Sequence, residues 1–190
     1  MNSSKLFLSL LLPLWAGATV DAQAQQKLVP AQSEIVFVSK QMGVPVEGRF
    51  KKFDAQISFD AAKLDTSKVN FTVDMGSATL GAPETDAELP KPTWFNLVKF
   101  PQATFTSSAI KALGAGKFEV TGKLTIKGNV RDVVVPVTMV QAGAATTATG
   151  TLPIKRLAFR IGENEWADTS MVADDVSVKF KFGLTGVGKL

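Results

Sequence analysis

The most regular alternation of apolar and polar residues in the chain runs from residue 117 to residue 140. One parity of its first half is apolar: Phe118, Val120, Gly122, Leu124 and Ile126. The other parity is polar: Lys117, Glu119, Thr121, Lys123, Thr125 and Lys127. Because successive side chains of a strand point to opposite faces, this half predicts a half-buried strand with its lysines outward.

The same alternation resumes after the glycine-containing turn at residues 127–129. Its apolar positions are Val133, Val135, Val137 and Met139. Two such runs joined by a short turn predict a β-hairpin. Pro136 cannot donate a hydrogen bond to a neighbouring strand, so we expect a bulge or a local opening there.

Similar extended patterns recur along the chain, at residues 33–40, 44–50, 53–59, 69–73, 102–110, 148–153, 155–161 and 176–184. Prolines interrupt the pattern over residues 83–100, where one or two short helices are expected, with Thr85 and Thr93 as N-caps. Many antiparallel strands at hairpin spacing predict an all-β barrel or sandwich. A barrel is favoured because closure leaves no free strand edge. An outer-membrane barrel would have an apolar exterior, which the lysine-bearing hairpin does not offer.

The first two dozen residues have the pattern of a signal peptide. Lys5 is followed by an apolar stretch over residues 6–18 and by Ala22-Gln23-Ala24, which matches a cleavage site. The apolar stretch is shorter than the roughly 20 residues that a membrane-spanning helix needs. We therefore expect residues 1–24 to be removed, residues 25–190 to form one domain, and the protein to reside in a bacterial periplasm.

Composition narrows the chemistry. Cysteine and histidine are both absent, so the chain has no thiol nucleophile, no disulfide, and neither the commonest general base nor the commonest transition-metal ligand. The formal net charge is +4, but the lysines are spread through the strands, which argues against nucleic-acid binding. This charge suits weak attraction to anionic lipid, so transient contact with a membrane surface stays open, as does a homodimer.

Aromatic residues are the main candidates for a binding site. Phenylalanines and tryptophans occur on most of the predicted strands and in the loops: Phe37, Phe50, Phe53, Phe71, Trp94, Phe95, Phe105, Phe159 and Trp166. They suit either an apolar lumen that holds a ligand or ordinary core packing. Arg156 and Arg160 suit either a polar headgroup at the barrel mouth or solvated surface charge.

Carboxylates cluster at residues 84–88, 163–165 and 174–175. A hydrolase acting on a small lipid or glycan would need two of them at a defined separation, and proximity in the sequence does not supply it. None of the clusters matches a calcium-binding loop, and no catalytic constellation or metal site is predicted. A barrel filled by its own side chains, serving a structural or interaction role, is the remaining alternative.

Several short motifs resemble the YceI-like family of periplasmic polyisoprenoid-binding proteins. They are Ser33-x-Ile35-x-Phe37, Gly48-x-Phe50-x-x-Phe53, Phe59-Asp60, Phe100-Pro101-x-Ala103-Thr104-Phe105 and Thr121-Gly122-x-Leu124-Thr125-Ile126-x-Gly128, with Arg131 following. The resemblance covers essentially all of residues 25–190. It implies an extended eight-stranded antiparallel β-barrel, lipocalin-like in shape, whose lumen holds a long isoprenoid, a quinone or a fatty-acid-like lipid. It also implies a carrier that binds without catalysis and needs no other cofactor.

Overall fold

The structure is a computed structural model that describes residues 26–190, so the predicted signal peptide lies outside the described residues. Antiparallel strands dominate it: β1 (Lys27–Gln41), β2 (Val44–Phe50), β3 (Phe53–Ser58), β4 (Lys68–Asp74), β5 (Ala78–Thr79), β6 (Gln102–Gly114), β7 (Lys117–Ile126), β8 (Asn129–Ala142), β9 (Ala145–Lys155) and β10 (Asp175–Thr185). The short helical elements are η1 (Leu64–Thr66), η2 (Met75–Ser77), α1 (Pro83–Asp86), η3 (Arg156–Phe159) and η4 (Asn164–Ala167). The predicted all-β fold is confirmed.

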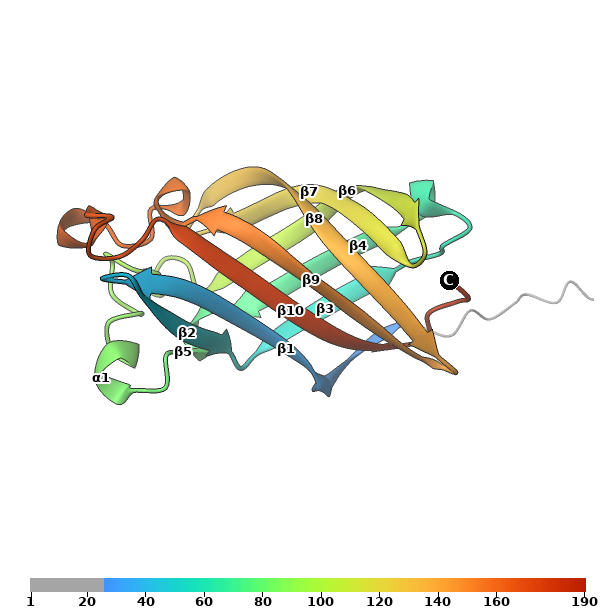
Figure 1. The fold of residues 1–190 in the computed structure, drawn as a ribbon, viewed down its shortest axis with the longest axis horizontal. Coiled ribbons are helices and arrows are strands. Elements are labelled where there is room, and N and C mark those ends of the chain that lie inside the picture. Colours follow the sequence, from blue (N-terminus) through green and yellow to red (C-terminus); the bar gives the residue numbers. More distant parts are fainter. Residues whose placement is uncertain (1–25) are drawn as a thin grey trace, which may run out of the picture.

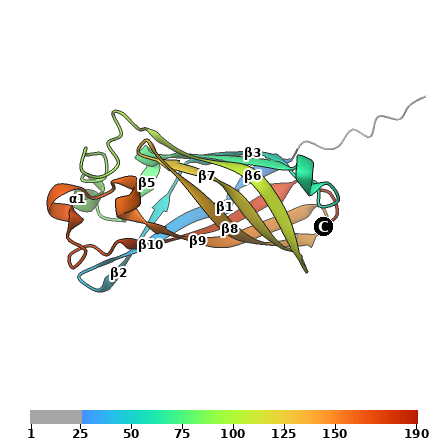
Figure 2. The same cartoon turned by 90° about the horizontal axis from the view of Figure 1, so that it is seen from above.

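All ten strands belong to one sheet, in the order β3-β4-β6-β7-β8-β9-β10-β1-β2-β5. The sheet curls into an elongated half-barrel, called the barrel below (Figures 1 and 2). α1, η3, η4 and the β1–β2 turn gather at one end, which we call the loop end, and the C-terminus lies at the other (Figure 1).

Ten strands replace the eight that the family resemblance implies, because two runs are interrupted. β3 follows β2 after only Lys51 and Lys52, and η2 alone separates β4 from β5. β2 pairs with β1 and β5, whereas β3 pairs with β4. Counting each interrupted run once restores the eight.

Two local expectations were wrong. β9 ends at Lys155, and residues 156–159 form η3 instead of continuing a strand, since Arg160 adopts a left-handed backbone with φ of 57°. In the 83–100 connection, α1 begins at Pro83 with Ala82 as its N-cap, and residues 93–98 form turns, so neither threonine caps a helix.

Pro136 produces the local opening and no bulge. The register between β7 and β8 continues through the pair Glu119 and Pro136 without a shift. On the other side of β8, the ladder with β9 ends at the pair Val137 and Gly150. From there to the loop end, β8 and β9 are not paired with each other, which is consistent with a missing backbone donor at proline.

Candidate ligand-binding site

An apolar cavity of about 360 Å³ runs inside the barrel. Side chains from the inward faces of the strands and from the 80–95 connection line it. Those of the predicted hairpin that do so are Phe118, Val120, Leu124, Ile126, Val135, Val137 and Met139. A barrel filled by its own side chains would leave no such space, so this alternative is contradicted. The volume falls in the range of small-molecule sites, roughly 300 to 1,000 Å³.

The structure brings most of the predicted aromatic residues to this cavity. Seven line it: Phe37, Phe50, Phe71, Trp94, Phe95, Phe105 and Trp166. Two do not: Phe53 packs against Phe182 with ring centroids 5.8 Å apart, and Phe159 is buried beneath the loops. Whether any of the nine contacts a ligand stays a prediction.

Glycines on neighbouring strands make room for two inward-facing rings. Phe37 pairs directly with Gly48, and a Cβ atom at residue 48 would lie 2.2 Å from the ring. Phe180 covers its partner Gly150 in the same way. Such rings lie flat along the wall, and the lumen between the walls stays open.

Polar side chains that line the cavity come from its loop end. They are Ser39 and Gln41 at the end of β1, Thr85 in α1, Glu88 after it, and Arg156 at the start of η3. At the opposite end, Phe59 and Phe118 meet edge to face at 5.2 Å. The cavity is therefore polar at one end and apolar along the rest of its length.

Two polar atoms at the loop end are buried and have no hydrogen-bond partner among the described residues: Ser39 Oγ and Trp94 Nε1. Buried polar groups in folded proteins are nearly always paired, and an unpaired one costs about 1 to 3 kcal/mol. Both residues line the cavity. A polar group on a bound ligand would satisfy them.

Arg156 stabilises the loop formed by residues 161–173. The residue is 2% exposed, and its guanidinium donates five hydrogen bonds to backbone carbonyls: Ala173, Ile161, Gly162, Trp166 and Val172. Burial lowers the pKa of Arg156, although a guanidinium remains charged in proteins. Its donors are thus taken up by residues 161–173, and a role in headgroup binding stays a prediction.

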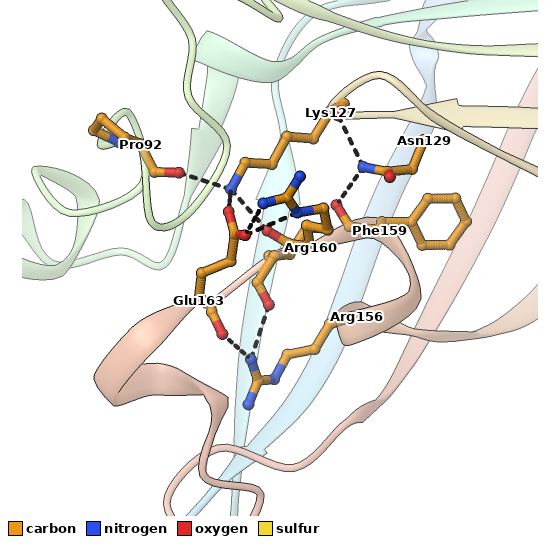
Figure 3. Close-up of polar contacts among 9 residues, drawn as sticks. Pro92, Lys127, Asn129, Arg156, Phe159, Arg160 and Glu163 are labelled. Atoms are coloured by element: carbon orange, nitrogen blue, oxygen red, sulfur yellow. Dashed lines mark hydrogen bonds and ion pairs between the residues drawn. The ribbon is translucent and has the colours of Figure 1, made fainter.

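Lys127, predicted to face outward, is buried instead. It lies in the β7–β8 turn with a φ of 49°, which turns its side chain away from the polar face. Its ammonium donates to Pro92 O at 2.7 Å, Arg160 O at 2.7 Å and Glu163 Oε2 at 2.8 Å (Figure 3). Asn129 adds bonds to Lys127 O and Phe159 O. Sequence reasoning missed this cluster; a lysine inside the glycine turn was its only signal.

The second arginine predicted for a headgroup, Arg160, is exposed and pairs with Glu163 at 2.8 Å. Hydrogen bonds from Lys127, and then from Arg160, hold the pKa of the Glu163 carboxyl below its ordinary value, against the opposing effect of burial. This pair faces the Lys127 cluster (Figure 3). Headgroup binding by Arg160 also stays a prediction.

Most of the clustered carboxylates have structural partners. Asp86 accepts from Thr79 and from Leu80 N, and these bonds lower its pKa. Asp174 accepts from Leu157 N. Two further members pair with lysines: Glu88 with Lys91, and Asp175 with Lys155. This arrangement favours a role in fixing loops.

Metal and membrane features are limited in the described part of the chain. Residues 26–190 hold no group of three or more acidic, cysteine or histidine side chains placed to bind a metal ion. Within the same residues, no helix has the length and apolar character to cross a membrane.

Comparison with known proteins identifies the family of the chain. Residues 26–184 match the family pattern of the YceI-like domain. The chain belongs to the YceI-like domain family. The crystal structure of BcnA from Burkholderia cenocepacia is 49% identical, has a TM-score of 0.79, and is matched over 82% of this chain and 98% of that one.

Two further comparisons are more distant. A UPF0312 protein of Ectopseudomonas mendocina is 35% identical over 96 residues, which is 50% of each chain. The matched stretch thus spans about half the length of such curated relatives. A polyisoprenoid binding domain from Saccharophagus degradans, implicated in plant cell wall breakdown, is 16% identical with a TM-score of 0.67 over 85% of this chain and 98% of that one, and so shares the fold.

Proposed function

We propose that this YceI-like protein is a periplasmic carrier or buffer for a long isoprenoid lipid or a similar chain, which it binds without catalysis. The observation that carries the proposal is the elongated apolar cavity whose polar side chains lie at one end. Burial of a lipid tail contributes about 0.8 kcal/mol per CH₂ group, so a long chain binds such a cavity without special chemistry.

The ligand's orientation follows from the same asymmetry. Its tail lies along the apolar length of the barrel toward Phe59 and Phe118, and its headgroup lies at the loop end. Ser39 Oγ and Trp94 Nε1 hydrogen bond to this headgroup, because both are buried beside the cavity and have no partner among residues 26–190. An indole N–H is a donor only, so the headgroup carries an acceptor oxygen or nitrogen.

Organic extraction of the purified protein followed by mass spectrometry tests the function. We expect a long-chain isoprenoid or comparable lipid in near-stoichiometric amount, and uptake of a polyprenyl probe by the extracted protein. Recovery of no lipid together with no uptake of the probe would reject the proposal. Turnover of a lipid or glycan that is lost when Glu88 or Glu163 is replaced by alanine would favour the hydrolase alternative.

Replacement of Trp94 tests the headgroup contact. Trp94→Phe keeps an aromatic ring and removes the N–H donor, so affinity for a polyprenyl ligand with a polar head should fall about 2- to 10-fold. Affinity for the matching hydrocarbon without a head should not change. Equal losses for both ligands would show that Trp94 acts through packing alone.

A further inference from the structure

The outer face of β8 is largely apolar, unlike the outer faces of β7 and β10. Val130, Val134 and Val140 are 46%, 52% and 64% exposed, and Pro136 is exposed between them. The outward positions of β7 carry Lys117, Glu119, Thr121, Lys123 and Thr125. Those of β10 carry Asp175, Ser177, Lys179 and Lys181. Exposed apolar residues gathered on one face of a protein mark a contact with a partner or a membrane.

The apolar face continues onto β9 as an uncharged surface. Thr149 and Thr151 face outward there, followed by the exposed Pro153. We call the outward residues 130, 134, 136 and 140 of β8, with 149, 151 and 153 of β9, the β8–β9 face. The two other outward positions of β8 are polar: Thr138, and Asp132, whose carboxylate pairs with Lys123 at 2.9 Å.

Basic side chains flank the β8–β9 face on both sides. On the β7 side, Lys117 lies beside Thr138 and the acidic Glu119 lies beside Pro136 in the strand register. On the β10 side, Lys179 and Lys181 lie beside Thr151 and Thr149. Strands β7 to β10 together hold six basic and three acidic residues, which are Lys117, Lys123, Arg131, Lys155, Lys179, Lys181, Glu119, Asp132 and Asp175. An uncharged centre with a positive rim is complementary to an anionic lipid surface.

Most of the β8–β9 face, residues 130, 134, 136, 151 and 153, lies on the outer side of the section where β8 and β9 are unpaired, while residues 140 and 149 lie on the paired section. Beyond the pair Val137 and Gly150, no backbone pairing joins β8 to β9, and their ribbons part (Figure 1). On the inside of this opening, Val135, Leu152 and Ile154 line the cavity. A lipid surface seated on the face would therefore adjoin the unpaired section of the wall that borders the lumen.

We propose that the β8–β9 face docks the barrel onto anionic lipid bilayers. Valines 130, 134 and 140 enter the interfacial region, while Lys117, Lys179 and Lys181 contact lipid phosphates. For a lipid carrier, as proposed above, docking by this face brings the cavity wall to the surface that supplies or receives the ligand. Docking itself depends on the outer face and is measured without a ligand in the lumen.

Co-flotation of the lipid-extracted protein with vesicles tests the docking. We expect partition onto phosphatidylcholine vesicles that contain phosphatidylglycerol, little partition onto pure phosphatidylcholine, and loss of binding at high salt. Replacing Lys179 and Lys181 by glutamine should weaken partition about 5-fold for each charge. The matched control, Lys63→Gln with Lys68→Gln, removes the same net charge from exposed positions near η1 and should have a much smaller effect.

The apolar residues are tested by a second pair of variants. Val134→Ser with Val140→Ser should reduce partition, whereas Val98→Ser, at a residue 96% exposed in the 83–100 connection, should not. Equal effects of test and control variants, or no partition of the wild type, would overturn the proposal. So would a wild-type dimer in sedimentation that the double serine variant dissociates, because a second copy would then cover the face. Probe uptake in vesicle-free solution is scored separately, so failure of lipid binding and failure of docking are distinguishable.

Discussion

At the scale of single residues, the shape of the lumen depends on pairing large rings with glycines. Phe37 occupies the space over Gly48 that a side chain would fill, and Phe180 does the same over Gly150. These rings contribute apolar surface to the cavity without closing it, since they lie against the wall. The absence of a side chain on β2 is thus as important for the site as the ring on β1.

Gly48→Ala should therefore destabilise the protein. The new methyl group would overlap the Phe37 ring, and overpacking of this kind costs about 1 to 3 kcal/mol in free energy of unfolding. The displaced ring would enter the lumen and weaken binding of a polyprenyl probe. Urea unfolding and probe titration check both effects.

Gly188→Ala is the matched control, because no atom lies within 4 Å of its added methyl group. Its free energy of unfolding should change by less than about 0.5 kcal/mol. If both alanine variants unfold at the same urea concentration as the wild type, the ring and the glycine are not tightly packed.

At the scale of elements, the β7–β8 turn is joined to two loops by one buried ammonium. Lys127 connects this turn to the 83–100 connection through Pro92 and to the residues after η3 through Arg160 and Glu163 (Figure 3). Three acceptors use all three of its N–H donors. The cluster thereby holds together the segments that bring Trp94 and Trp166 within 5.5 Å of each other at the loop end.

Glu163→Gln tests this cluster through pH. Because the pKa of Glu163 is lowered in the folded state, its contribution to stability is present above its ordinary pKa of 4.5 and is lost as the pH falls through the lower folded value. At pH 7 the substitution should cost about 1.5 to 3 kcal/mol, the range for hydrogen bonds to charged groups. The difference from the wild type should shrink at acidic pH in urea unfolding series.

Glu165→Gln provides the comparison, since residue 165 is exposed two positions away. It should change the free energy of unfolding by less than about 0.5 kcal/mol. A constant cost of Glu163→Gln from pH 7 down to acidic pH would contradict the charge-based account of the cluster.

Alternation of residue type predicted the strands well because one face of each meets the lumen and the other meets water. It failed where backbone turns change the side-chain direction. Lys127 continues the polar parity of β7, yet its left-handed backbone directs the side chain inward. Residues 156–161 include four apolar residues, but residues 156–159 form η3 and Arg160 turns the chain with a left-handed backbone.

The residues of the candidate site were predictable to the same extent as the strands that carry them. Strand parity sufficed to place Phe71 and Phe105 at the cavity, whereas both faces of the strand with Phe37 are apolar. It could not show that Phe53 turns toward Phe182, nor that Ser39 and Trp94 from distant segments meet one cavity end with unpaired polar atoms. Such placements depend on how the sheet curls and on the loops that cover it.

At the scale of the whole molecule, the barrel has two distinct directions. Along its axis, the cavity runs from the apolar end at Phe59 to the polar loop end, which orients a ligand. Around its axis, β4, β6, β7 and β8 pair with one another in turn. β8 and β9 are unpaired on the loop-end side of Val137. The first direction underlies the proposed binding of lipid, and the second underlies the proposed docking to a bilayer.

Tryptophan fluorescence tests the central claim most directly, because the chain has three tryptophans and no tyrosine. Removal of the predicted signal peptide takes away Trp15 and leaves Trp94 and Trp166, and both line the loop end of the cavity. Two polyprenyl probes are compared, one with a collisional quencher at the headgroup and one with the same quencher at the tail terminus. Saturable, stoichiometric quenching by the head-labelled probe alone is the predicted result. Equal quenching by both probes, or quenching by the tail-labelled probe alone, would contradict the proposed orientation, and no saturable quenching by either would contradict lipid binding in the lumen.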